Sequence, residues 1–232
     1  MDENNNFYGP FYDDHGNEIE FEEWFHGGEP IKKKRIIGPL LMGLRKDSFR
    51  PALLAGLLMC LATVYSPKLS YRIYVSTADL VDLPIAFIRS LGSIFVHADF
   101  SHLGSNLLLF IPFAWLLTNY FGKHAFPIMG IVGGIVTNFL TVYFYHLSGK
   151  NSSLVGASGM VYLLASQWIA LYLRWDLRHT VPQRVVRSIG VAMMLLLPTQ
   201  YSPSTSYLAH GIGFVVGLIF AIPFMFKSKG QN

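Results

Sequence analysis

Residues 151–173 read NSSLVGASGMVYLLASQWIALYL, a run of 23 residues without Asp, Glu, Lys or Arg. A helix of about 20 apolar residues spans a bilayer, and runs of about 17–25 residues are candidates for such helices. Four more uncharged runs flank this one, at 51–67 (17 residues), 100–122 (23), 124–149 (26) and 188–226 (39). The longest is interrupted by PTQYSPSTS at 198–206, a turn-forming stretch, so it predicts two helices.

The composition of the 232-residue chain agrees with a membrane location. Apolar residues make up 52% and charged residues 14%, against roughly 25% charged residues in soluble domains. Nine of the 14 acids precede residue 32, whereas the 182 residues from Pro51 onward hold four. These numbers exclude an ordinary soluble domain. The net charge of +4 comes with no long basic face, which argues against a nucleic-acid partner, and the single Cys60 excludes a disulfide framework.

The sequence therefore predicts an all-α membrane protein, a bundle of six transmembrane helices over residues 50–226. We expect the spans at roughly 50–67, 102–120, 125–147, 157–174, 184–199 and 207–226. Residues 1–35 form a polar, acidic segment that is either a disordered tail or a small folded appendage. Residues 36–49 are expected to lie along the membrane interface, and 227–232 form a short tail.

The distribution of basic residues predicts the orientation of this bundle. With a cytoplasmic N-terminus, the inner segments carry fourteen lysines and arginines and the outer loops carry four. Such an excess of basic residues on the cytoplasmic side is the usual rule for membrane proteins. We therefore expect both termini in the cytoplasm. A bacterial inner membrane is the expected location, since the chain is compact and carries no organelle transit signal.

Polar side chains within the spans are candidates for function, because burying them in a membrane is costly. His102 and Asn106 lie one turn apart at the start of the second span, Ser158 starts the fourth, and His210 starts the sixth. In the predicted topology these three spans all begin at the outer surface. Three separate helices thus place polar groups at one depth, which an isolated structural serine or histidine does not explain.

A metal site is a weaker interpretation of the same histidines. His97 and His102 are five residues apart, whereas zinc ligands on one helix prefer a spacing of four. The bundle has no cysteine cluster, and Asp99 is the only acid nearby. We therefore expect no metal and no other cofactor.

The combined motifs resemble those of the rhomboid family of intramembrane serine proteases over residues 50–226. The family signatures HxxxxHxxxN, GxSG and AHxxGxxxG occur in family order, at His97–Asn106, Gly156–Gly159 and Ala209–Gly217. The resemblance implies that Ser158 is the nucleophile and His210 the general base. It also implies that His102, Asn106 and the backbone N–H of Ser158 hold the oxyanion.

The resemblance assigns supporting roles as well, with two departures. Tyr162 matches the tyrosine that packs on the catalytic histidine, and His97 matches the histidine that steadies the outer loop. The usual Trp-Arg pair of that loop is Ile88-Arg89 here, and a glutamate usual at the inner end of the second span is Thr118. These departures concern loop anchoring and helix packing, not the chemistry.

The positions of the acids independently favour a Ser-His dyad over a triad. Asp176 lies 18 residues beyond Ser158, about 27 Å along a helix. The other acids after Asp47 are Asp79, Asp82 and Asp99, which lie in or beside the outer loop that runs from Lys68 to Val96. No acid is placed to orient His210, so packing must hold its ring. The small residues Gly156, Gly159, Gly213 and Gly217 are suited to the close helix approach that brings His210 to Ser158.

The sequence thus predicts an endopeptidase that hydrolyses peptide bonds in or near transmembrane segments of other membrane proteins. The resemblance implies lateral access for these substrates, between the second and fifth spans. One alternative is a catalytically silent rhomboid-like protein that binds membrane clients, and another is a small-solute channel. Retention of both Ser158 and His210 argues against the first, and the absence of charged residues facing inward argues against the second. The pattern specifies neither the substrate nor the oligomeric state.

Overall fold

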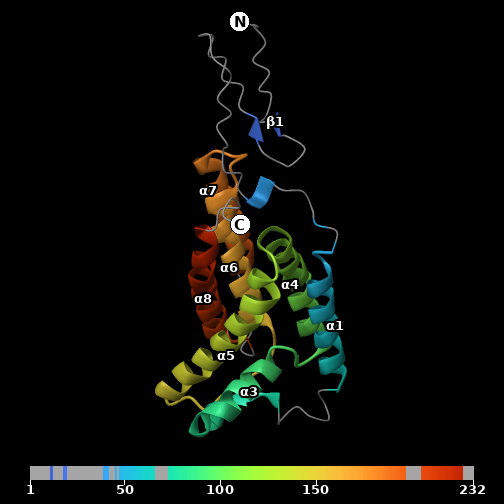
Figure 1. The fold of residues 1–232 in the computed structure, drawn as a ribbon. Helices are drawn as coiled ribbons and strands as arrows, with labels where there is room; N and C mark the ends of the chain where they lie inside the picture. Colours follow the sequence, from blue (N-terminus) through green and yellow to red (C-terminus); the bar gives the residue numbers. More distant parts are fainter. Residues whose placement is uncertain are drawn as a thin grey trace, which may run out of the picture.

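The described part of the computed structural model is a bundle of helices with a short helix across one end (Figure 1). It comprises residues 11–12, 18–19, 39–41, 45, 47–65, 73–196 and 205–226. The longer helices are α1 (Arg50–Tyr65), α3 (Leu83–Ser93), α4 (Phe100–Phe121), α5 (Gly130–Leu147), α6 (Ser158–Trp175), α7 (Val181–Leu196) and α8 (Tyr207–Met225). The shorter elements are β1 (Phe11–Tyr12), β2 (Glu18–Ile19), η1 (Pro39–Leu41), β3 (Val75–Ser76), η3 (Thr77–Val81), η4 (His124–Met129) and β4 (Ser153–Leu154).

Among the described residues, three segments are long and apolar enough to cross a membrane by length and composition: Phe100–Phe121, His124–Leu147 and Tyr207–Met225. Helix α1 is apolar but shorter, and α7 carries Arg184 and Arg187. The all-α membrane fold is therefore as predicted, whereas the count of six spans stays a prediction. The third expected span is also less regular than its uncharged run suggested, because Phe126 has extended backbone just before α5 begins.

Helix α6 is the centre of the bundle. It packs against α4, α5, α7 and α8, and most of its residues are buried, including Leu163, Leu164 and Leu171. Helix α1 packs on the outer side of α4. Because α6 is surrounded by protein, it needs less apolar surface toward lipid than α4 or α8. This explains why its composition is the more polar one.

Elements β3, η3 and α3, which precede α4 in the chain, form a cap at one end of the bundle (Figure 1). Strand β3 pairs with β4 in antiparallel register, Val75 with Leu154 and Ser76 with Ser153. Helix α3 lies across this end and packs on α5, while Val81 and Ile88 stay largely exposed. Such exposed apolar side chains are suited to contact with a membrane surface.

The predicted terminal segments fall mainly outside the described residues. Of the acidic segment 1–35, only β1 and β2 are described, and they pair as an antiparallel ladder. Of the interfacial segment 36–49, η1 and residues 45 and 47–49 are described. The tail 227–232 lies wholly outside them.

Candidate active site

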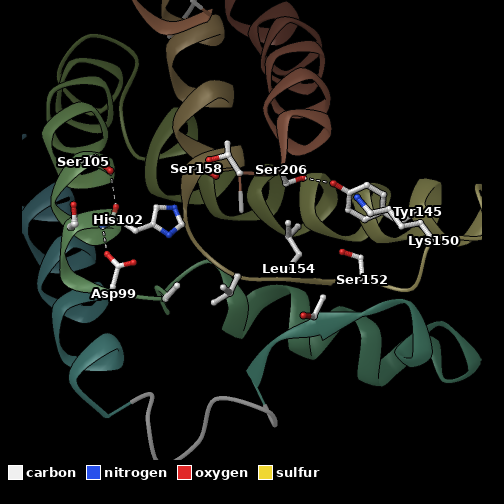
Figure 2. A pocket seen from close by; sticks show the side chains of 14 residues that line it. Asp99, His102, Ser105, Tyr145, Lys150, Ser152, Leu154, Ser158 and Ser206 are labelled. Carbon is white, nitrogen blue, oxygen red and sulfur yellow. Dashed lines mark hydrogen bonds between the residues drawn. The ribbon is translucent and has the colours of Figure 1, made fainter. Parts of the chain in front are cut away.

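A polar cleft of about 460 Å³ opens at the capped end of the bundle, where α4, α6 and α8 all begin (Figure 2). Hydroxyl groups dominate its walls, which come from the start of α4, the segment before α6, the end of α5 and the residues before α8. The lining residues are Ala98, Asp99, Ser101, His102, Ser105, Tyr145, Lys150, Ser152, Ser153, Leu154, Val155, Ser158, Thr205 and Ser206. Of the predicted polar residues, His102 and Ser158 line this cleft, whereas Asn106 and His210 do not, although both lie in the first two turns of α4 and α8 at the same end of the structure.

Ser158 is the first residue of α6 and lines the polar cleft. The chain turns sharply just before it, because Gly156 has φ +110°, a conformation that side chains disfavour. A Cβ at Gly156 would also lie 2.8 Å from Cε1 of His102, so only glycine fits beneath that ring. The turn leaves Ser158 at a helix N-terminus, where backbone N–H groups lack partners within the helix.

His97 joins the turn before Ser158 to two other parts of the fold. Its Nε2 accepts a hydrogen bond from the Ala157 N–H at 3.2 Å, and its Nδ1 lies 3.4 Å from Oγ1 of Thr63 on α1. The Nε2 atom can accept only in the tautomer with the proton on Nδ1, which then donates to Thr63. The side chain is fully buried. Burial, reinforced by nearby His102, lowers the pKa of His97 to about 4, so the ring is neutral near pH 7.

His102 and Asn106 lie on the face of α4 that meets this turn. The carboxylate of Asp99 caps the helix by accepting the His102 N–H at 2.7 Å, and the His102 ring meets that of His97 edge-on, with centroids 5.3 Å apart. Asn106 is buried, and its amide nitrogen donates to the His102 carbonyl at 3.0 Å. This bond uses one of two amide N–H groups, so the second can still serve a ligand oxygen.

His210 is held by aromatic rings on α6 and α8. Its ring stacks on that of Tyr162 with centroids 4.1 Å apart and an angle of 11° between planes. The ring of Tyr207 meets it edge-on at 6.0 Å, and the Tyr162 hydroxyl donates to the carbonyl of Leu195 on α7. Nε2 of His210 is buried and has no hydrogen-bond partner among the described residues. An unpaired imidazole nitrogen of this kind can accept a hydrogen bond from a substrate, or from the Ser158 hydroxyl if that side chain rotates toward it.

Close contact between α6 and α8 brings His210 beside the start of α6. A Cβ at Gly213 would overlap the carbonyl oxygen of Gly159, and one at Gly217 would overlap the Leu163 carbonyl and the Ser166 hydroxyl. A Cβ at Gly159 would in turn lie 3.4 Å from the carbonyl oxygen of Ala209 on α8, and 2.8 Å from Cγ2 of Thr137 on α5. The two backbones therefore touch along this line, as small residues permit in membrane helices.

No hydrogen bond links Ser158 to His210 within the described residues, and no described carboxylate bonds His210. Catalytic hydrogen bonds are often long in free enzymes and shorten when substrate binds. The same residues hold no group of three His, Cys, Asp or Glu side chains arranged to bind a metal ion. His97 and His102 instead make the protein contacts described above.

Sequence reasoning did not identify the far wall of the polar cleft. Tyr145 Oη lies 2.8 Å from Ser206 Oγ, which also caps α8, and Nζ of Lys150 lies 4.6 Å from the centre of the Tyr145 ring (Figure 2). Lys150 stands alone between two uncharged runs, and that isolation was the one available signal. Ser206 belongs to the turn-rich stretch 198–206, in which nothing distinguishes it from the neighbouring serines.

A family model of the rhomboid domain matches residues 85–227. The chain belongs to the rhomboid family. The rhomboid match runs from α3 through α8 and includes every candidate site residue from His97 to Gly217. Comparison with curated proteins finds no match. This protein is therefore a helical integral membrane protein of the rhomboid type.

Both departures from the rhomboid pattern have local replacements. Arg89 pairs with Asp79 in η3, with Nη1 and Oδ1 2.5 Å apart, which anchors α3 within the cap without the usual tryptophan. The Thr118 hydroxyl donates to the carbonyls of Ala114 at 2.8 Å and Phe126 at 3.1 Å. Thr118 thus joins α4 to the turn before α5 with a neutral group where a rhomboid glutamate is usual.

Proposed function

We propose that this rhomboid is an intramembrane serine endopeptidase in which Ser158 is the nucleophile and His210 the general base. The supporting observation is the α6–α8 contact at Gly159 and Gly213, which sets the Tyr162–His210 stack beside the start of α6. Stacking fixes the ring without an acid, while Nε2 stays unbonded to any described residue. A positioned base beside a helix-start serine is the arrangement that nucleophilic catalysis requires.

The proposed reaction uses groups around the polar cleft. His210 Nε2 takes the proton of the Ser158 hydroxyl as its oxygen attacks the peptide carbonyl, and later returns a proton to the leaving amine. The developing oxyanion accepts from the Ser158 backbone N–H, from the free N–H of Asn106 and from His102. Water for the second step reaches Ser158 through the cleft, whose hydroxyl-lined walls are compatible with water.

The proposed substrates are single transmembrane segments that unwind near the outer membrane face. In this proposal the cleft faces outward and both termini face the cytoplasm of a bacterial cell, because fourteen basic residues then lie inside and four outside. Six helices cross the bilayer in the same proposal. Access is lateral, between α4 and α7, so a substrate helix need not leave the membrane.

The test is cleavage of a model transmembrane substrate by the purified full chain in detergent. Ser158→Ala and His210→Ala should each abolish turnover, and the double variant should be no worse, because the pair acts as a unit. A fluorophosphonate probe should label the wild type and fail on Ser158→Ala. Ser105→Ala is the matched control: its hydroxyl also lines the cleft but donates to the His102 carbonyl, so labelling should continue.

The alternative, a catalytically silent client-binding rhomboid, predicts a different result. Such a protein binds the substrate helix but neither cleaves it nor reacts with the probe. Cleavage that persists in clean Ser158→Ala protein would exclude Ser158 as the nucleophile.

A further inference from the structure

A second cavity, of about 90 Å³, lies between α6 and α7. Trp168, Ile169 and Tyr172 line it from α6, and Arg187, Ser188 and Val191 line it from α7. Tyr172 is 14 residues after Ser158, or about 21 Å along the helix axis. The α6–α7 cavity is therefore distinct from the polar cleft and lies toward the opposite end of the bundle.

The α6–α7 cavity is mainly apolar but contains an unsatisfied hydroxyl. Ser188 is 6% exposed, and its Oγ is buried without a hydrogen-bond partner among the described residues. An unbonded buried hydroxyl is unfavourable, so such a group calls for a physical reason. A ligand that combines an apolar chain with hydrogen-bond acceptors would fill the cavity and satisfy Ser188.

Positive charge is concentrated where α6 ends and α7 begins, the stretch that contributes Arg187 to this cavity, and it is poorly compensated. Residues 173–190 contain four arginines (Arg174, Arg178, Arg184 and Arg187) and one acid, Asp176. Asp176 is fully buried and already bonds Arg178 at 2.8 Å and His179 at 2.6 Å. Burial by itself would raise its pKa, but hydrogen bonds from Arg178 and His179 hold the pKa of the carboxyl below its usual value. Asp176 is therefore ionised and already bonded to Arg178 and His179, so it does not neutralise the charge of Arg187.

Arg187 stands at the rim with unused donors. Its Nη1 donates to Nε2 of His179 at 2.6 Å, and its other N–H groups bond nothing in the described part of the chain. Arg184 does not line the cavity; its Nη1 donates to the Leu173 carbonyl at 2.7 Å and its Nε is buried. The guanidinium group of Arg187 can therefore still bind an anion, and arginine suits phosphate oxygens well.

We propose that the α6–α7 cavity binds an anionic phospholipid. Part of an acyl chain packs against Trp168, Ile169 and Val191, the phosphate bonds Arg187, and the Ser188 hydroxyl donates to an ester or phosphate oxygen. Basic pockets between membrane helices recognise anionic headgroups in this way. The cytoplasmic leaflet, which this end of the bundle faces in the orientation of the proposed function, is rich in such headgroups. The apolar lining favours a lipid over free phosphate, because inorganic phosphate gains nothing from Trp168 or Val191.

The experiment measures lipids retained by the purified full chain in dodecyl maltoside micelles, by native mass spectrometry. The micelles contain dioleoyl phosphatidylglycerol or dioleoyl phosphatidylcholine, and a third sample contains inorganic phosphate alone. The wild type should retain phosphatidylglycerol in preference to phosphatidylcholine and retain no phosphate. Arg187→Gln should weaken phosphatidylglycerol binding about fivefold, the effect of one basic residue at a membrane surface.

Two further variants distinguish a lipid site from diffuse charge attraction and from a simple packing defect. Lys123→Gln removes an exposed positive charge just after α4, near the same end of the bundle, and should leave retention unchanged. Ser188→Leu fills the cavity without changing charge and should lower retention of both lipids. Melting temperatures should show that each variant is folded.

Three outcomes would overturn the proposal. Equal losses in Arg187→Gln and Lys123→Gln would mean diffuse attraction rather than a site. Retention of inorganic phosphate alone would assign the arginines to a free anion. A Ser188→Leu variant that melts higher yet retains lipid normally would make the cavity a packing defect.

Discussion

Replacement of Gly213 by alanine should separate the catalytic machinery from overall stability. The added methyl group would overlap the carbonyl oxygen of Gly159, and ordinary contact requires at least 3.4 Å. Backbone atoms of α6 cannot rotate out of the way as a side chain could, so α8 must shift. His210 lies three residues before Gly213 on the same face of α8 and moves with it.

The expected magnitudes differ for folding and for catalysis. Overpacking of a well-packed contact costs about 1–3 kcal/mol, which a folded bundle tolerates. A displacement of about 1 Å of a catalytic group costs roughly 100-fold in rate. Gly213→Ala should therefore stay folded, melt at a somewhat lower temperature and cleave a fluorogenic transmembrane substrate about 100-fold more slowly.

Gly211→Ala is the matched control, because it adds the same methyl group to the same helix next to His210. A Cβ at Gly211 meets nothing within 4 Å, and alanine favours a helix over glycine by up to about 1 kcal/mol. This variant should keep wild-type turnover and equal or higher stability. If Gly213→Ala cleaved at the wild-type rate, the α6–α8 contact would not set the position of His210 and the reasoning would be wrong.

Further predictions concern the neighbouring residues and the orientation. The pKa of His97 is about 4 in the folded protein and 6.5 in the unfolded chain, so the unfolded chain binds a proton first as the pH falls. The free energy of unfolding should therefore drop by up to about 3 kcal/mol between pH 6.5 and pH 4. Thermal unfolding measured against pH should show this drop in the wild type and a flatter profile in His97→Gln. Asn106→Ala should lower kcat at least about tenfold while KM and melting temperature change little, whereas a purely structural role would lower stability and spare the rate per folded molecule. The orientation can be tested with single cysteines at the exposed positions Ser148 and Thr180 in a chain without Cys60. A thiol reagent that cannot cross the membrane should label the cysteine at 148 from outside the cell and should not label the one at 180. The reverse labelling would overturn the orientation.

Much of the fold follows from charge patterning along the sequence. A helix in lipid cannot hold charges cheaply, so uncharged runs located α4, α5 and α8 directly. The same rule made polar residues at helix starts conspicuous, and the structure brings the starts of α4, α6 and α8 together. Helices α1, α6 and α7 were harder to judge. Helix α1 is only 16 residues long, and α7 carries Arg184 and Arg187. Protein contacts bury most of α6, which relaxes its demand for apolar residues.

Contacts between distant polar residues could not be predicted. The bond from His97 to Thr63 joins residues 34 positions apart, and Tyr145 meets Ser206 across 61 positions. Neither pair has a periodic pattern or a charge that would indicate its partner. The cap built from β3, η3 and α3 could likewise not be predicted, because its strands are two residues long and carry no alternation.

Tyr162 links the proposed general base to helix α7. Its ring lies on His210, while its hydroxyl donates to the Leu195 carbonyl in the last turn of α7. If α7 swings away from α6 to admit a membrane segment, that bond breaks and the histidine loses part of its support. A serine without a well-placed base is a poor nucleophile. In the proposed protease, outward movement of α7 and loss of support for His210 would then be the same motion. A substrate helix would meet a correctly positioned Ser158–His210 pair only after α7 had closed again.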